Sequence, residues 1–537
     1  MKKLAVVVMV MVFALGFALA AYADDTAPSD TAVVAKGDTK ITLGGEIRFR
    51  GEYTDDRYNQ INSGTRYSTT TVATSAANTV TVTSTDRGPI SPNNDHQAYY
   101  DGRVRINMDA KVADNVHGYI ELESGNGTNS DTWNWGNAGA ATYPTATSGS
   151  GSTGVFPSGN SEVGGGMFIR QAWIAYEMPM WGVKTGHQLL ILGNGLFFDH
   201  TRYGDDAIVV YVNPVKNLTI AGLTAKFQSG PAATSVFVGQ TTASSPNGTG
   251  KADNADGYVL LAAYKGNNFN ISGDITAVND QAFAAVTIPV HAWNFGLRAD
   301  GTISAFTLRG DLELQTGELI MNTPGVSDGR LKGWAGLAGI DYKVGPWKLT
   351  GEFAYGSGKA GSDGSANQPE FITSLGNDQH YTYVYEYRTK AGSGIVSSGL
   401  TNTMYVKGGA SVDITEQLKA ETYLYWLQAP QAVALNDASG PAAFTGASTN
   451  LSALTYTPNY SRNLGWELDG KVTYAFAKNL QWWIEGGYFW TGTAYNYRVN
   501  ETTYVNTVNP GPPVTYTAYT YGRDNAYAIR NGIELKF

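Results

Sequence analysis

The sequence contains no cysteine, and only 15% of its residues are charged. Without cysteine the chain cannot form disulfides, cysteine-type zinc sites, iron–sulfur clusters or covalently attached c-type haem. Acidic residues outnumber basic ones, 46 to 37, and the resulting formal net charge of -9 disfavours nucleic acid as a partner. After residue 23 there is no continuous apolar run of about 18 residues, so no transmembrane helix is expected there.

Residues 1–23 have the features of a secretory signal peptide. Two lysines follow the first methionine, residues 4–19 are largely apolar, and residues 21–23 read Ala-Tyr-Ala, a small-x-small cleavage site. We expect cleavage after residue 23. An exported chain without a spanning helix is either a soluble protein or a transmembrane β-barrel.

A two-residue alternation of apolar and polar side chains separates these two classes. In residues 41–53 the odd positions carry Ile, Leu, Phe, Tyr or Gly, whereas the even positions carry Thr, Glu, Arg or Gly. The same alternation returns in residues 100–112, 303–315, 347–355, 404–413, 464–474 and 480–488. A helix would instead place apolar residues three and four apart. The pattern therefore predicts β-strands that have one apolar and one polar face.

Short and long connections alternate between these strands. Short turns rich in Gly, Pro, Asn and Asp are expected at residues 114–115, 179–181, 213–214, 266–267, 300–301, 345–346, 413–416 and 477–479. Long polar segments lie near residues 56–97, 124–166, 229–255, 358–401, 428–461 and 493–523. Short periplasmic turns and long extracellular loops are typical of bacterial outer-membrane barrels. We therefore predict an all-β, transmembrane antiparallel β-barrel over residues 41–537, preceded by a short periplasmic segment over residues 24–40.

The alternation gives 18 candidate strands, and an even number returns the C-terminus to the periplasmic side. They fall near residues 41–53, 99–112, 116–124, 167–177, 182–192, 206–212, 218–228, 256–265, 268–279, 291–299, 303–315, 332–343, 347–357, 402–413, 417–427, 462–476, 480–490 and 525–537. Most reach the roughly 9 to 11 residues that a tilted strand needs to cross a bilayer. Two of them, 206–212 and 256–265, are apolar on both faces, which leaves the count open between 16 and 20.

The ends of the strands carry aromatic residues, and the chain ends in Phe537. Aromatic residues beside the short turns are Trp181, Tyr342, Trp347 and Tyr474, and those at the opposite strand ends are Tyr53, Tyr355, Trp426, Tyr488 and Trp490. Two aromatic girdles are expected where a barrel meets the two membrane interfaces. A last strand that ends in phenylalanine resembles the signal by which outer-membrane barrels are recognised for assembly. The last strand of a soluble domain is the alternative.

Four stretches of the sequence are similar to a known family: 168–173 (FIRQAW), 185–188 (TGHQ), 202–206 (RYGDD) and 464–469 (LGWELD). In order and spacing they resemble the alginate-export-like and related substrate-specific porins. The resemblance implies an 18-stranded barrel in the outer membrane of a Gram-negative bacterium, with passive transport of small hydrophilic solutes or ions. Its surroundings would be outer-membrane lipid and lipopolysaccharide, and both a monomer and a homotrimer remain open.

If the apolar residues face lipid, the alternate residues line the lumen. Closure of the last strand on the first would bring five arginines onto neighbouring inner walls, namely Arg48, Arg50, Arg103, Arg105 and Arg530. Half a circumference away, the strands offer three carboxylates, Asp274, Asp311 and Glu313. A basic wall facing an acidic wall would create a transverse field that favours polar solutes. In the alternative, the charges pair locally, Arg298 and Arg309 with Asp311 and Glu313, and Arg105 with Glu121.

Outside the strands, residues 197–202 form the densest cluster of chemically active side chains. Asp199, His200 and Arg202 could fold inward as a constriction loop or belong to a plain extracellular loop. Residues 252–257 superficially resemble a calcium loop, but the first ligand position is occupied by alanine and the final glutamate is missing. No metal site is predicted from this segment.

Catalytic motifs are lacking in the sequence. The six histidines are scattered, and neither a His-Glu-x-x-His motif, a Gly-x-Ser-x-Gly elbow nor a phosphate-binding glycine pattern occurs. We therefore predict no catalytic residues, cofactor or metal. Two alternatives remain open: a barrel enzyme such as a phospholipase, and a barrel that forms a sheath or scaffold for a partner such as an outer-membrane cytochrome complex.

Overall fold

The computed structural model describes the chain in separate ranges. These are residues 33–36, 39–55, 66–75, 78–86, 97–125, 133–134, 166–201, 204–228, 255–280, 290–320, 327–360, 367–375, 381–385, 399–433, 461–495, 497–499, 519–521 and 525–537. The predicted signal peptide and its cleavage site lie outside them, as does Arg202. Within these ranges no helix is long and apolar enough to span a membrane.

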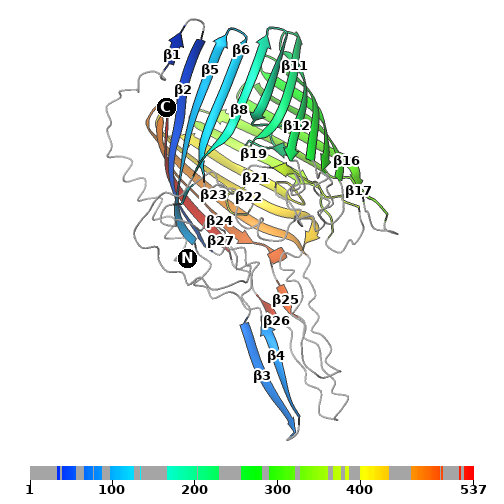
Figure 1. Ribbon diagram of the computed structural model, residues 1–537. Coiled ribbons are helices and arrows are strands. Elements are labelled where there is room, and N and C mark those ends of the chain that lie inside the picture. Colours follow the sequence, from blue (N-terminus) through cyan, green and yellow to red (C-terminus); the bar gives the residue numbers. More distant parts are fainter. Residues whose placement is uncertain are drawn as a thin grey trace.

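One antiparallel sheet closes on itself to form a barrel (Figure 1). Its wall has 18 strands: β2 (Thr39–Asp55), β5 (Gln97–Ala113), β6 (Val116–Gly125), β8 (Gly166–Met178), β9 (Trp181–Gln188), β11 (Asp205–Val215), β12 (Leu218–Gln228), β13 (Ala255–Lys265), β14 (Phe269–Asp280), β15 (Val290–Ile303), β16 (Phe306–Leu319), β18 (Trp334–Val344), β19 (Trp347–Gly356), β21 (Met404–Asp413), β22 (Leu418–Val433), β23 (Ser461–Ala477), β24 (Leu480–Thr491) and β27 (Ala526–Lys536). Strands that follow one another along the wall are paired, and β27 closes the ring against β2. The predicted fold class is confirmed.

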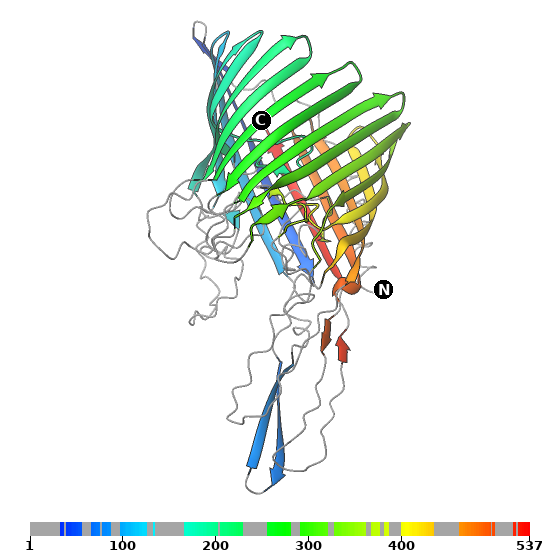
Figure 2. The same ribbon diagram turned by 90° about the vertical axis from the view of Figure 1, so that its right-hand side faces the viewer.

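Shorter strands accompany this wall. They are β1 (Val33–Lys36), β3 (Arg66–Ser75), β4 (Asn78–Asp86), β7 (Trp133–Asn134), β10 (Phe198–Asp199), β17 (Gly329–Leu331), β20 (Ser374–Leu375), β25 (Tyr497–Val499) and β26 (Tyr519–Tyr521), with one 3-10 turn, η4 (Thr493–Tyr495). β1 pairs with the first residues of β2, so part of the stretch predicted to be a separate periplasmic segment belongs to the sheet. The hairpins β3–β4 and β25–β26 extend away from the barrel at the end opposite the short turns (Figures 1 and 2).

Each of the 18 predicted strands corresponds to one strand of the wall, but two predicted turns are misplaced. The turn expected at residues 213–214 is formed by Lys216 and Asn217, and the turn expected at residues 300–301 is formed by Ser304 and Ala305. Asn217 and Ser304 have positive φ angles, 71° and 57°, which the tight turns require. Two-residue hairpin turns depend on this backbone conformation more than on the presence of Pro or Gly nearby.

The two faces of the wall differ in polarity. On β15 the side chains of Trp293, Phe295 and Leu297 are exposed, whereas Asn294 and Arg298, at the alternate positions, are buried. The same alternation on the other strands makes the outer face apolar and the inner face polar, as expected for a barrel surrounded by lipid.

Aromatic residues gather at both ends of the outer face. Tyr342 stacks on Phe306 beside a short turn, with ring centroids 4.7 Å apart. At the opposite strand ends Tyr355 stacks on Trp334 at 4.6 Å. These pairs lie where the two girdles were predicted.

The C-terminal residue is held by the first strand of the wall. Phe537 exchanges two backbone hydrogen bonds with Gly45, of 2.8 and 3.0 Å. A Cβ atom at Gly45 would lie 2.6 Å from the ring of Phe537, so the ring covers a position that only glycine can occupy. The terminal aromatic ring therefore contributes to closure of the barrel.

Candidate functional site

The connection between β9 and β11 folds into the barrel. Asn194 donates a side-chain hydrogen bond of 3.1 Å to Asp311, on the inner face of β16. Gly193 has a φ of 55°, and a Cβ there would overlap the guanidinium group of Arg298 on β15. This connection, here called inward segment A (residues 189–201), therefore crosses the lumen to strands that are not its neighbours.

Two of the three residues predicted as a candidate constriction loop lie in inward segment A. The carboxylate of Asp199 accepts hydrogen bonds from the backbone and hydroxyl of Thr201, at 3.0 and 2.6 Å. His200 contacts Asp205 through Nδ1 at 2.8 Å and the hydroxyl of Ser374 through Nε2 at 3.0 Å. Asp199 therefore stabilises a turn within the segment, and His200 fastens the segment to β11 and to β20, whereas Arg202 lies outside the described residues.

The connection between β19 and β21 supplies two further segments inside the barrel. In inward segment B (residues 367–375) the backbone of Ile372 exchanges two hydrogen bonds, of 2.8 and 3.0 Å, with the side chain of Gln315 on β16. The backbone N–H of Ser374 donates to the carbonyl of Phe197 at 2.7 Å, and β20 pairs with β10. Segments A and B are thus joined to each other as well as to the wall.

Inward segment C (residues 381–385) is bound to two carboxylates of β23. Glu467, which is 0% exposed, accepts backbone hydrogen bonds from Val384 at 2.5 Å and Tyr385 at 2.8 Å. Asp469 accepts a third, from the backbone of Tyr383 at 3.1 Å. The ring of Tyr383 lies 5.4 Å from the guanidinium carbon of Arg530 on β27. Segment C therefore reaches from β23 to the strand that closes the barrel.

Apolar side chains of the three segments pack within the lumen. Phe197, Phe198 and Phe371 are all buried in one cluster with residues of the inner wall. Tyr385 packs against Phe489 of β24, with ring centroids 5.5 Å apart. Because this packing adds to the hydrogen bonds above, the segments are built into the fold and narrow the lumen.

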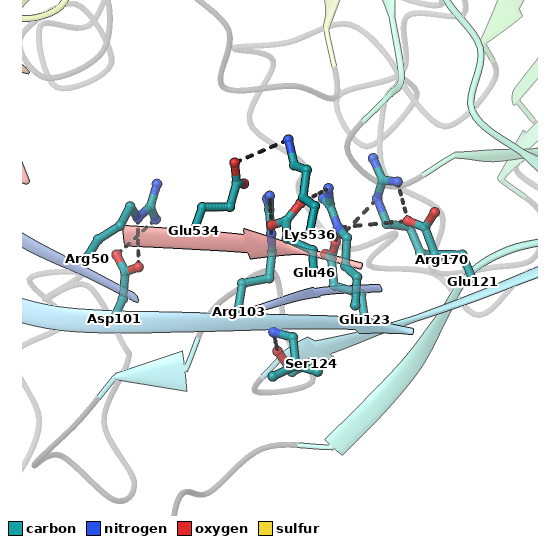
Figure 3. Close-up of polar contacts among 12 residues, drawn as sticks. Glu46, Arg50, Asp101, Arg103, Glu121, Glu123, Ser124, Arg170, Glu534 and Lys536 are labelled. Carbon is teal, nitrogen blue, oxygen red and sulfur yellow. Dashed lines mark hydrogen bonds and ion pairs between the residues drawn. The ribbon is translucent and has the colours of Figure 1, made fainter. Parts of the chain in front are cut away.

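Another part of the inner wall carries a band of charges, drawn in part in Figure 3. Its ion pairs join seven cations, Arg50, Arg103, Arg105, Arg170, Lys471, Arg530 and Lys536, and seven carboxylates, Glu46, Glu52, Asp101, Glu121, Glu123, Glu485 and Glu534. These fourteen residues are here called the charged belt. They lie on the inner faces of β23, β24, β27, β2, β5, β6 and β8.

The strand register explains how these charges meet. Arg50 lies opposite Asp101, Glu46 lies opposite Arg105, and Glu52 lies opposite Arg530. Directly opposed side chains on neighbouring strands interact, and opposite charges there are favourable. Arg50 Nε contacts Asp101 at 2.7 Å, as Figure 3 shows.

Neighbouring pairs extend this contact along the wall. Arg103 Nε donates to Glu46 at 2.8 Å. Arg170 contacts Glu121 at 2.5 Å and Glu123 at 3.3 Å (Figure 3). The belt therefore joins neighbouring strands of the wall, such as β2 with β5 and β6 with β8, in separate groups of ion pairs.

The predicted basic wall is interleaved with carboxylates. All five predicted arginines lie on β2, β5 and β27, but four of them form ion pairs of the belt, and Arg48 lies opposite Glu534 and Arg103 in the register. The ion pairs of these arginines correspond to local pairing, the alternative that the sequence left open. Arg105, for example, lies 3.8 Å from Glu121.

The three predicted acidic residues lie together on β14 and β16. Asp274, Asp311 and Glu313 all pair with the guanidinium group of Arg298, which is 5% exposed. The alternative of local pairing also joined Arg309 to Asp311 and Glu313, but Arg309 pairs with Asp341 at 2.9 Å and with Glu352. Arg309 lies opposite Gly339 in the register, so its side chain extends over β18 toward Glu352 on β19.

Comparison with solved structures finds three Pseudomonas aeruginosa proteins among the similar ones. OccK8 (OprE) has 10% identity and a TM-score of 0.48, over 93% of this chain and 98% of that chain. OccK2 (OpdF), solved in complex with glucuronate, has 8% identity and a TM-score of 0.48, over 92% and 98%. The outer membrane protein OpdK has 8% identity and a TM-score of 0.47, over 92% and 98%. Comparison with curated protein sequences gives no match.

Comparison with protein families gives a match over residues 241–509, just over half of the chain, to the family described as Alginate export. The chain belongs to the alginate export family. This alginate export family protein is a porin-type β-barrel of the Gram-negative outer membrane. The predicted family, location and barrel are thereby confirmed.

Three residues that hold the inward segments of this alginate export family protein were not predicted as site residues. Arg170 pairs with the charged belt and also donates a hydrogen bond of 2.5 Å to the carbonyl of Thr201 in segment A. Glu467 and Asp469 hold segment C. All three lie in the stretches 168–173 and 464–469 that carried the family resemblance, and that signal could have pointed to them.

Metal binding has no support in the described part of this alginate export family protein. There, no group of three or more His, Cys, Asp or Glu side chains is arranged to hold a metal ion.

Proposed function

We propose that the protein is a passive channel through which small hydrophilic solutes and ions diffuse across the outer membrane. This proposal rests on the difference in side-chain exposure between two parts of the inner wall. Segments A, B and C fill the lumen beside β15, β16 and β23, where the side chain of Arg298 is only 5% exposed. The arginine side chains of the charged belt keep between 11% and 19% exposure. Water therefore reaches the belt, and it also reaches Arg309 of β16, whose side chain is 24% exposed. We take the belt as the path for solutes because its charges extend over neighbouring strands from β23 to β8.

A sheath or scaffold for an inserted partner is disfavoured by the same segments. A partner in the lumen would have to displace segment C from Glu467 and segment B from Gln315, and thereby leave buried polar groups without hydrogen bonds. Diffusion past the segments requires no such displacement.

A barrel enzyme is also disfavoured, although Asp205, His200 and Ser374 have the residue types of a hydrolase triad. Ser374 is 0% exposed, and the ring of His200 stacks on Phe198 at 4.2 Å and packs edge-on against Phe227 at 5.2 Å. A substrate would have no access to the serine hydroxyl, so these three residues are better explained as a fastening between segments A and B.

The test combines two measurements on refolded protein. In planar bilayers we expect discrete current steps, and in liposomes we expect entry of the neutral sugar arabinose above the rate of protein-free liposomes. Heat-modifiable mobility on a gel checks that the barrel has folded. A folded barrel that gives neither current steps nor arabinose entry would contradict the proposal.

A further inference from the structure

We propose that the charged belt selects small zwitterions, solutes that carry one ammonium and one carboxylate group, over solutes of similar size that carry a single charge. The inference rests on the proposed channel function and names the substrate class of that channel. It follows from the balance, the alternation and the accessibility of the charges in the belt, and from its place beside segment C.

The charges of the belt are nearly balanced. Seven cationic and seven carboxylate side chains take part in its ion pairs, and Arg48, on the same inner face of β2, adds one cation. A solute with one charge is attracted by one member of a pair and repelled by the other. A pathway of this kind provides little net preference for either sign.

Cations and carboxylates face each other across most neighbouring strands in this part of the wall, although Arg48 lies opposite Arg103 as well as Glu534. Along β27 and β2 the register places Lys536 opposite Glu46 and Arg530 opposite Glu52, and Arg530 also lies opposite Glu485 of β24. Within the ion pairs the charged atoms are in contact, as between Arg50 Nε and Asp101 Oδ1 at 2.7 Å. This separation is similar in scale to that between the ammonium and carboxylate groups of a small amino acid.

Both signs of charge keep some exposed side-chain surface, which is smallest for the carboxylates Asp101 and Glu52, each 2% exposed. In the pair of Arg103 with Glu46 the side chains are 11% and 10% exposed. In the pair of Arg530 with Glu485 they are 16% and 13% exposed. A zwitterion can thus offer its carboxylate to a guanidinium group and its ammonium group to the adjacent carboxylate. A solute with one charge can make a favourable contact with only one member of such a pair.

The belt also lies where the path is narrowed. The ring of Tyr383 in segment C is in cation–π contact with Arg530, with 5.4 Å between the guanidinium carbon and the ring centroid, so segment C reaches the belt and narrows the lumen beside it. Interactions at a narrowing influence permeation more than interactions in a wide vestibule, because the solute loses part of its hydration there.

The primary experiment measures uptake of three labelled solutes of similar size into proteoliposomes: glycine, glycolate and ethanolamine. Rates in protein-free liposomes are subtracted, and arabinose serves as the neutral reference. We expect glycine to enter at least about threefold faster than glycolate and ethanolamine. If arabinose enters but glycine has no advantage, the zwitterion inference is overturned while the channel function stands. If no solute enters, both are overturned.

A matched pair of variants tests whether the belt is responsible. Arg50→Gln removes a cation and Asp101→Asn removes the carboxylate that it contacts. In a salt gradient across a planar bilayer, the reversal potential should shift toward cation preference in the first variant and toward anion preference in the second. The double variant should return close to the value of the unmodified protein. Shifts in the same direction, or no shift in folded variants, would contradict a balanced belt.

Discussion

Replacing Glu467 by glutamine is expected to loosen segment C and increase the current through the channel. The carboxylate of Glu467 is fully buried and accepts the backbone N–H groups of Val384 and Tyr385 at 2.5 and 2.8 Å. Glutamine has a single side-chain oxygen, so it can keep one of these bonds comfortably. Its amide NH2 group would then face the second N–H, and two donors cannot bond to each other.

The expected size of the effect follows from this count. A hydrogen bond to a charged acceptor contributes about 1.5 to 3 kcal/mol, so the loss of one bond should raise the detached population of segment C by roughly ten- to a hundredfold. The hydrogen bond from the backbone of Tyr383 to Asp469 remains in the variant and limits the release. We therefore expect intermittent rather than permanent displacement.

Single-channel recording can detect this change. Glu467→Gln should show more frequent transitions to a larger conductance, because segment C narrows the path beside the belt. Asp341→Asn is the matched control, since Asp341 is also a carboxylate of the inner wall but accepts hydrogen bonds from Arg309 and Thr350 on neighbouring strands. If the folded Glu467→Gln channel matches both the control and the unmodified protein in open conductance and noise, the assigned role of segment C is refuted.

Two further substitutions, each with a matched control, test the contacts of segment A with the wall and the buried charges of the inner wall. Gly193→Ala should alter conductance because its new Cβ would overlap Arg298, whereas Gly345→Ala, at a similar φ of 57° but with nothing within 4 Å, should leave the conductance unchanged. Equal behaviour of the two variants would attribute the effect to backbone strain alone. Arg298→Met removes the counter-charge of three buried carboxylates and should lower the free energy of unfolding by about 3 to 5 kcal/mol. Urea unfolding in lipid vesicles, followed by tryptophan fluorescence, measures this, and Arg330→Met is the control, because the pair of Arg330 with Glu318 is largely exposed and should contribute about 0 to 1 kcal/mol. Similar unfolding midpoints for these two variants would contradict the inference from burial.

The barrel could be predicted because its strands follow a strict local rule. A lipid-facing residue alternates with a lumen-facing residue along each strand, and this period is visible in the sequence without any knowledge of neighbouring strands. Turn positions were less predictable. Asn213 and Pro214 attracted the prediction, yet the positive φ angle lies at Asn217 and the strand continues through an irregularity between Val212 and Val215.

The arrangement of charges depends on register, which the sequence does not display. Alternation alone places Arg48, Arg50, Arg103 and Arg105 on the inner face, and it does so correctly for the face. A wall of arginines and a series of ion pairs differ only in the offset between β2 and β5. The observed offset sets Arg50 against Asp101 and Glu46 against Arg105. A shift of two residues would preserve the inner face and change every partner.

The inward segments were the least predictable part of the site, since their contacts join residues that are far apart in the chain. Segment B depends on Gln315 and segment C on Glu467, and nothing in the polar composition of the connections indicates these partners. The stretches that resembled the family nevertheless contained Arg170 and Glu467, two of the wall residues that hold segments A and C. The resemblance therefore marked anchors on the wall, and one of them, Arg170, also belongs to the belt that we propose as the solute path. Exchange of the other belt residues should change what passes without changing how the barrel folds.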